Sequence, residues 1–149
     1  MAKGQEGCAA MEESPELETL THRFYNAIAS GDVGVVRKLT SRREGMLGIG
    51  TDPNEWFEGA EPIVGHIKAQ SDEMGGQLAI VHGDPHGYQE GSAGWVSDRA
   101  AAWRLGDGTE VPFRFTAVFH KEDGDWKMVQ FHRSIGVLNE SVVGKALPT

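Results

Sequence analysis

Two of the arginines in the aromatic-rich C-terminal half of the chain are the residues best suited to bind a charged ligand. Arg133 follows Phe131 near the end of a strand-like segment, and Arg99 lies in the segment before it. If a turn of about seven residues around Asp107-Gly108 joins these two segments as paired strands, both arginines fall on one phenylalanine-lined face. A shift of one residue in the strand pairing would move Arg99 to the opposite face. The spacing therefore predicts two guanidinium groups on an aromatic wall.

A guanidinium in such a place needs a partner, because removing a charge from water costs several kcal/mol. Two explanations satisfy this requirement. In the first, Arg133, and with it Arg99, binds a small anionic molecule. In the second, Arg133 forms an internal ion pair with an acid such as Asp98 or Glu61. The sequence leaves both open.

The histidines offer a second kind of chemistry. His82 and His86 share one face of a predicted strand, with Asp84 between them, a spacing that could suit a metal ion. The sequence shows no third ligand, and Pro85 indicates a bend in the strand. We therefore expect no metal site here.

The segment Glu110–Leu138 must position Arg133, and it reads as two long strands that alternate between two faces. Lys121–Asp125 supplies the turn. A five-residue turn pairs Phe119 with Lys127 and Phe113 with Arg133, which makes one face a phenylalanine wall. The other face is expected to carry Arg114, Thr116, Trp126, Met128, Gln130, His132 and Ser134. His132 on that face favours a structural, hydrogen-bonding role over an acid–base role.

Helices precede these strands. Ser14-Pro15 is a helix start, with a capping hydroxyl followed by proline at the first position, and Gly31 ends that helix. Asp32 caps a short second helix, and a third runs from about Ala60 to Met74. Two further strands are predicted over Gln77–Tyr88 and Gly94–Arg104. Helices followed by an antiparallel run of strands predict an α+β fold.

The hairpin also resembles known families. The segment from Thr116 to Ser134, TAVFHKEDGDWKMVQFHRS, resembles the last hairpin of the association (hub) domain of calcium/calmodulin-dependent kinase II. It is also similar to the W-x-h-V-x-x-H-x-S ending of SnoaL-like proteins, which share the nuclear transport factor 2-like (NTF2-like) fold. Residues 27–32, AIASGD, resemble the link between the first two helices of that fold. The resemblance implies a cystatin-like cone, with three helices against a curved antiparallel sheet over residues 15–138.

The resemblance also implies a pocket between the helices and the sheet. Arg133 matches one of the two pocket arginines of the hub domain. The position of the second holds Ala117 here, so the pair of arginines is incomplete, and Arg99 would have to take the place of the second one. Aromatic and polar neighbours complete the expected ligand-binding set, which comprises Arg133, Arg99, Tyr25, Trp56, His66, Phe115 and Phe131.

The same fold hosts ketosteroid isomerases, which need a carboxylate base and an oxyanion donor. The position of the isomerase tyrosine holds Phe24, and Tyr25 is expected on a different face of the helix. The base position falls near residues 48–49, with Asp52 the nearest carboxylate. The third-strand acid falls near residues 116–117, where no acid stands. We therefore do not expect isomerase activity.

The composition limits the number of domains and the classes of partner. A chain of 149 residues with a formal charge of −8 predicts one domain and argues against nucleic acid and polybasic membrane contacts as partners. Cys8, the only cysteine, excludes an intrachain disulfide. With no apolar leader and no cofactor motif, we expect a cytoplasmic protein without a cofactor. Residues 1–14 are expected to be a flexible leader and residues 139–149 an irregular tail.

Three functions stay open from the sequence. The first is binding of a small polar or anionic molecule in the cone. The second is a lyase, isomerase or cyclase-like activity on a hydrophobic metabolite, which needs Asp52, His66 or His132 to point inward. The third is a non-catalytic association module. In each case we expect a homodimer through the outer sheet face with Trp126, Met128 and His132, because this patch is too apolar to stay exposed to water.

Overall fold

The helices begin and end where their capping residues predict. The computed structural model describes residues 10–149, so Cys8 and residues 1–9 of the expected leader lie outside it. Helix α2 (Pro15–Ser30) begins at Ser14, whose hydroxyl accepts a hydrogen bond from the backbone N–H of Leu17, and ends at Gly31 with a φ of 70°. Asp32 caps α3 (Val33–Leu39), and α4 (Ala60–Met74) ends at Gly75. None of the described helices is long and apolar enough to span a membrane.

The strands form two sheets. The larger has seven strands in the order β1-β5-β6-β9-β10-β2-β3, and the smaller has the order β4-β7-β8. The strands of the larger sheet are β1 (Glu12–Glu13), β5 (His86–Glu90), β6 (Ala93–Asp98), β9 (Arg114–Glu122), β10 (Asp125–Ser134), β2 (Leu47–Ile49) and β3 (Trp56–Glu58). Those of the smaller are β4 (Ala79–Val81), β7 (Ala102–Arg104) and β8 (Glu110–Pro112). Each of the two long strands predicted upstream is thus split between the sheets, β4 from β5 and β6 from β7.

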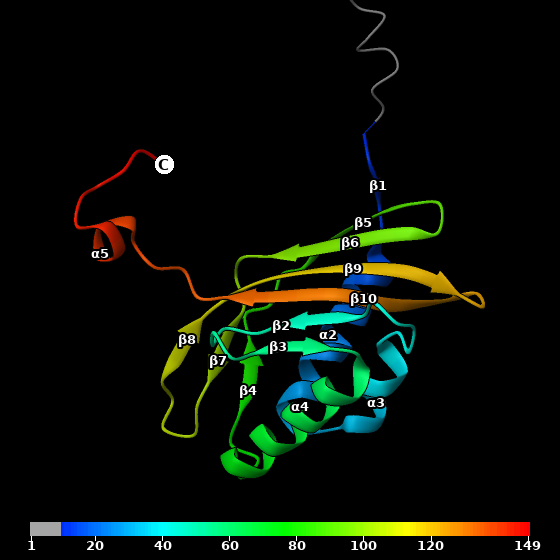
Figure 1. The fold of residues 1–149 in the computed structure, drawn as a ribbon, viewed down its shortest axis with the longest axis horizontal. Coiled ribbons are helices and arrows are strands. Elements are labelled where there is room, and N and C mark those ends of the chain that lie inside the picture. Colours follow the sequence, from blue (N-terminus) through cyan, green and yellow to red (C-terminus); the bar gives the residue numbers. More distant parts are fainter. Residues whose placement is uncertain (1–9) are drawn as a thin grey trace, which may run out of the picture.

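Helices α2, α3 and α4 cover one face of the larger sheet, and the smaller sheet closes one end of the space between them (Figure 1). The core there is aromatic: Phe24 and Tyr25 of α2 pack on Phe115, and Phe24 also packs on Phe131. This is the predicted α+β arrangement of helices against a curved sheet, although β10 and β2 pair in parallel and the sheet is therefore not wholly antiparallel as predicted. The opposite face of the sheet carries no helix within the described part of the chain.

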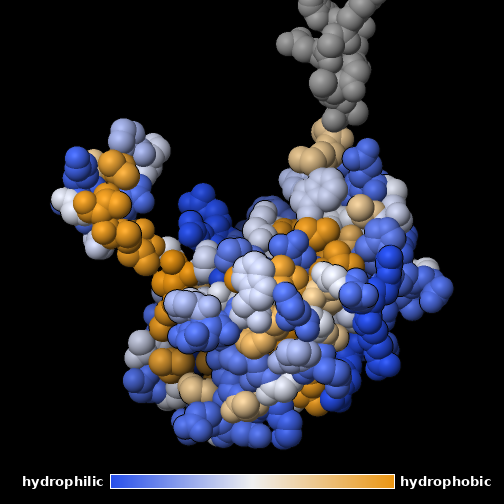
Figure 2. All heavy atoms as spheres, viewed as in Figure 1, coloured by the Kyte–Doolittle hydropathy of each residue, from blue (hydrophilic) through white to orange (hydrophobic). Residues whose placement is uncertain are grey.

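The two ends of the described chain behave differently. Glu12 and Glu13 pair with β5 and Ser14 is buried, so the expected flexible leader is anchored at these positions. The tail contains a short helix, α5 (Asn139–Val143), that projects away from the domain (Figure 1). Its exposed Leu138, Val142 and Val143 give this protrusion the apolar surface seen in Figure 2.

The predicted faces of β10 were wrong in the first half of the strand. The turn is only Asp123-Gly124, and the pairing of β10 with β9 shifts between Met128 and Gln130, so Val129 is an extra residue. Such a β-bulge reverses the alternation of faces. Trp126 and Met128 therefore point into the core, where they are 5% and 0% exposed, and do not lie on the outer face. After the bulge the predicted faces hold, with Phe131 and Arg133 inward and His132 outward, but Arg133 pairs with Phe115 and not with Phe113.

The predicted face of Arg99 was also wrong. Strand β6 pairs Val96 with Ala117 and Asp98 with Phe115, so Asp98 is the residue on the inner face and Arg99 is exposed. The strand was assigned one residue out of phase, which inverts every side chain along it. Further along, a bend between β6 and β7 returns Trp103 to the inner face, where its ring lies 4.6 Å from that of Phe113.

Candidate functional site

Arg133 lies inside the domain near the end of β10, and its guanidinium has no partner for two of its nitrogens. The residue is 3% exposed, and neither Nε nor Nη1 finds a hydrogen-bond acceptor among the described residues. The guanidinium carbon lies 5.6 Å from the ring centre of Trp103 and 5.8 Å from that of Phe131. Burial lowers the pKa of Arg133, and the charge of Glu55 opposes this. These contacts stabilise a cation but satisfy none of its N–H groups.

A buried tyrosine–carboxylate pair lies near this arginine. The hydroxyl of Tyr25 donates to Oδ2 of Asp98 over 2.8 Å, and the same oxygen accepts the backbone N–H of Asp84 over 3.0 Å. Oδ1 of Asp98 accepts the N–H of Ala100. Burial and the neighbouring carboxylate raise the pKa of Tyr25 well above its ordinary value. Both oxygens of Asp98 therefore accept hydrogen bonds, and none of these comes from Arg133.

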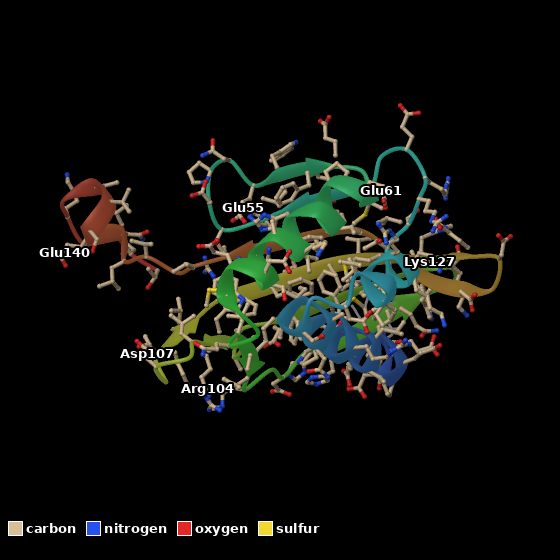
Figure 3. All side chains as sticks on the ribbon, turned by 90° about the horizontal axis from the view of Figure 1, so that it is seen from below. Glu55, Glu61, Arg104, Asp107, Lys127 and Glu140 are labelled. Carbon is tan, nitrogen blue, oxygen red and sulfur yellow. The ribbon has the colours of Figure 1, made fainter. Side chains whose placement is uncertain are left out.

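A second acidic residue, Glu55, reaches the site from the loop between β2 and β3, beside α4 (Figure 3). Its Oε2 lies 2.7 Å from Nε2 of His66 on α4, although the two atoms are not aligned for a hydrogen bond. The ring of His66 packs on Phe57 at 4.7 Å. Burial lowers the pKa of His66, Arg133 lowers it further, and Glu55 opposes both. The imidazole is therefore neutral at pH 7, beside a carboxylate and a buried cation.

Other buried polar atoms also lack a hydrogen-bond partner within residues 10–149. They include the indole Nε1 of Trp103 and the amide oxygen of Gln70. Trp103 contacts Arg133, and Gln70 lies one turn beyond His66 on the same face of α4. Native proteins pair nearly all buried polar groups, so several unpaired ones near a buried charge indicate a site for a polar ligand. The unpaired groups are mostly donors, which suits an anion.

The structure brings together most of the predicted site residues. Phe115 and Phe131 form the aromatic wall, and Arg133 and Tyr25 lie against it. His66 packs on Phe57 and joins the group through Glu55. Arg99 and Trp56 do not belong to this group, because Arg99 is exposed and Trp56 is 58% exposed on β3. Their expected places at the pocket were wrong.

The expected internal partners of Arg133 are occupied elsewhere. Glu61 is exposed and pairs with Arg37 over 3.1 Å, and Asp98 is held by Tyr25. The prediction that Asp98 or Glu61 pairs with Arg133 was therefore wrong for both acids. Glu55, the acid whose charge does act on Arg133, was missed because it lies in a turn-rich segment without strand or helix periodicity.

The remaining histidines lie outside the site. His82 pairs with Glu110 and His86 with Asp84, both at the surface. Within residues 10–149 no group of three His, Cys, Asp or Glu side chains could hold a metal ion. His132 is exposed on the outer sheet face, and Asp52 is exposed in the β2–β3 loop, where its carboxylate accepts the N–H of Asn54.

Comparison with known proteins gives the same fold. Residues 17–138 match the family model described as "SnoaL-like domain". No curated protein matches the chain. Among solved structures, an NTF2-like protein of unknown function from Pseudomonas putida has a TM-score of 0.74 at 16% identity, covering 89% of this chain and 91% of its own.

Two further structures carry a functional description. A protein from Xanthomonas campestris, described provisionally as a calcium/calmodulin-dependent protein kinase II association domain, has a TM-score of 0.66 at 18% identity, covering 87% of this chain and 97% of its own. A proposed dehydratase of the NTF2-like family from Streptomyces avermitilis has a TM-score of 0.65 at 15% identity, covering 82% and 95%. At these identities the likeness establishes the fold alone.

Proposed function

This chain belongs to the SnoaL-like domain family, and we propose that it binds a small anionic molecule between its helices and its sheet, on the guanidinium of Arg133. The observation that carries this proposal is a side chain only 3% exposed, two of whose nitrogens have no hydrogen-bond partner in the part of the chain that the structure describes. Leaving such a charge unsatisfied is costly, and a bound anion would remove most of that cost.

The surroundings favour a carboxylate over a larger or more highly charged anion. A guanidinium offers parallel N–H groups that fit the two oxygens of a carboxylate. Trp103 and Phe131 confine it with flat apolar surfaces, and Glu55 and Asp98 place negative charge nearby. A multiply charged phosphate would be repelled by these two acids. A singly charged organic acid with a small apolar body fits both features.

Binding is tested by thermal denaturation in the presence of acetate, pyruvate and 2-oxobutanoate. A ligand present at a hundred times its Kd adds about 2.7 kcal/mol to the stability of the native state. We expect at least one of these acids to raise the Tm of the wild-type chain and to have no effect on Arg133→Met. Arg99→Met is the matched control, because Arg99 is exposed and should leave the response intact. An unchanged wild-type Tm with all three acids argues against the proposal.

We further propose that the chain forms a homodimer through the outer face of the larger sheet. With Trp126 and Met128 removed to the core, this face is carried by Val118, which is 42% exposed, and by neighbours such as His132. A hollow of about 390 Å³ lies there, and Val118 and Val129 are part of its lining. Structures described as association domains are among the solved relatives, which favours self-association.

The oligomeric state is tested by light scattering after gel filtration. We expect a dimer for the wild-type chain and a monomer for Val118→Lys, because a buried lysine on each side of a symmetric interface would face its copy. Val142→Lys on α5 is the control, and it should stay dimeric if the sheet face, and not the protruding tail, forms the contact. A monomeric wild-type chain at high micromolar concentration would exclude this interface.

A further inference from the structure

The carboxylate of Glu55 is turned inward by its own loop. The backbone N–H of Glu55 donates to the carbonyl of Asp52, and the N–H of Gly50 donates to the carbonyl of Glu55. Oε1 accepts the N–H of Asp52 over 2.8 Å. A Cβ at position 50 would lie 2.7 Å from this same carboxylate, so glycine is needed there. Oε1 is thus held by the backbone, and Oε2 is left facing His66.

His66 is held so that one nitrogen faces this carboxylate and the other does not. Nε2 is buried and lies 2.7 Å from Oε2 of Glu55, and the ring packs on Phe57. The two atoms are not aligned for a hydrogen bond, but a negative charge this close favours the tautomer with hydrogen on Nε2, which leaves the lone pair on Nδ1. Because burial and Arg133 lower the pKa of His66, this lone pair is available at neutral pH.

A purely structural ion pair does not account for this arrangement. Glu55 is the carboxylate whose charge most strongly favours the cation of Arg133, yet its oxygens are directed to the Asp52 N–H and to His66. A fold that needed only to neutralise Arg133 would pair the two directly. Here the cation is left without a partner while a neutral base is held beside it. Anion site and base together are the two parts needed for proton transfer on a bound acid.

We propose that His66 is a catalytic base, positioned by Glu55, that removes a proton from carbon in a small 2-oxo acid bound through its carboxylate to Arg133. This inference rests on the anion site proposed above. Nδ1 of His66 takes the proton from the carbon next to the carbonyl, the C–H bond breaks, and its electron pair moves onto the carbonyl oxygen as an enolate. The unpaired indole N–H of Trp103 and the guanidinium of Arg133 supply donors for that oxygen. Return of the proton from His66 to this carbon restores the keto acid, and where the carbon is a stereocentre, return at the other face inverts it.

The reaction is tested in D₂O by proton NMR, with pyruvate and 2-oxobutanoate as probes. Deuterium uptake at the carbon beside the carbonyl reports each proton that is removed and then exchanged with solvent, without a need to know the product. We expect the wild-type chain to accelerate uptake about 10²- to 10⁴-fold over buffer with at least one probe. His66→Gln should abolish the acceleration while the Kd for the probe changes less than threefold. His22→Gln, at an exposed histidine of α2, is the matched control and should match wild type.

Glu55 is tested as a positioning residue through the pH profile. The rate should fall with decreasing pH as His66 becomes protonated. In Glu55→Gln the midpoint should move to lower pH, because the negative charge that raises the pKa of His66 is gone. Glu55→Asp should restore part of the wild-type profile. A merely structural Glu55 would change the amount of folded protein and leave the midpoint in place.

The outcomes separate this inference from the binding proposal. If either probe binds in an Arg133-dependent way and deuterium uptake stays at the buffer rate, the acid–base role of His66 is wrong and the binding proposal stands. If neither probe binds the wild-type chain, the 2-oxo acid class is wrong and this inference is overturned. Uptake that persists in His66→Gln also overturns it, because another residue must then be the base.

Discussion

Arg133→Met should make the protein more stable in the absence of a ligand. Methionine keeps most of the alkyl stem and removes the guanidinium, which is 3% exposed and has two nitrogens without a partner. Each unsatisfied buried donor costs about 1–3 kcal/mol. The cation–π contacts with Trp103 and Phe131 return about 1–2 kcal/mol of this. Replacing such a group with an apolar side chain of similar length is therefore expected to stabilise the fold by about 1–3 kcal/mol.

The assay is thermal and urea denaturation of the dialysed protein at pH 7. For a domain of this size each kcal/mol shifts the Tm by about 2–4 °C, so the variant should melt roughly 2 to 12 °C higher than wild type. Arg99→Met, at an exposed position, should change the Tm little. A loss of more than about 1 kcal/mol in Arg133→Met would refute the reasoning, because it would mean that an internal partner satisfies the guanidinium in solution.

Three further predictions concern other parts of the molecule. Tyr25→Phe should cost about 1–3 kcal/mol in urea denaturation, because it removes a buried donor from Asp98, and a change below 0.5 kcal/mol would contradict the hydrogen bond. Gly48→Ala should destabilise the fold, since its Cβ would lie 2.6 Å from the inward phenylalanine ring of β10, whereas Gly65→Ala, with open space around it on α4, should stabilise by about 0.5–1 kcal/mol. The pKa of His66 is lowered in the folded state, so this residue contributes stability above its ordinary pKa of 6.5, and that stability is lost as the pH falls below 6.5. His66→Gln should therefore flatten the dependence of Tm on pH below 6.5. An equal slope in both proteins would show that other groups are responsible.

The sequence predicted the helices well because their ends are set by local chemistry. Ser14, Asp32 and Gly31 each act within a few residues of their own position, through a capping side chain or a left-handed backbone. The fold class followed from the order of elements and from the resemblance of the hairpin. Neither prediction depended on a register between distant strands.

The faces of the strands were predicted less well, for a physical reason. The bulge at Val129 adds one residue to β10 without glycine or any other marker, so the alternation appeared continuous from Trp126 to Ser134. For Arg99, the predicted face depended on the assumed length of the turn, and nothing in the sequence indicated that the strand is divided into β6 and β7. The inward position of Arg133 was predicted correctly because the shorter turn and the extra residue each shift the pairing by one residue, and a total shift of two leaves the faces unchanged.

The candidate site was predicted in part. Arg133 was named from its predicted face and from the family motif, and Tyr25 and His66 were named as neighbours at the pocket that the resemblance implies. Glu55, Trp103 and Gln70 were not, since each reaches the site through a loop, a bend or a helix face that only the tertiary structure defines.

The position of Trp103 over Arg133 also gives the protein an optical property. Indole emission responds to nearby charge, and this ring lies 5.6 Å from the guanidinium carbon, inside the domain. Neutralising that cation with a bound acid would alter the field at the indole, whereas exposed Trp56 on β3 would be unaffected. A chain in which phenylalanine replaces Trp56, Trp95 and Trp126 would then carry a single built-in fluorophore, and occupancy of the site could be followed in solution without any attached dye.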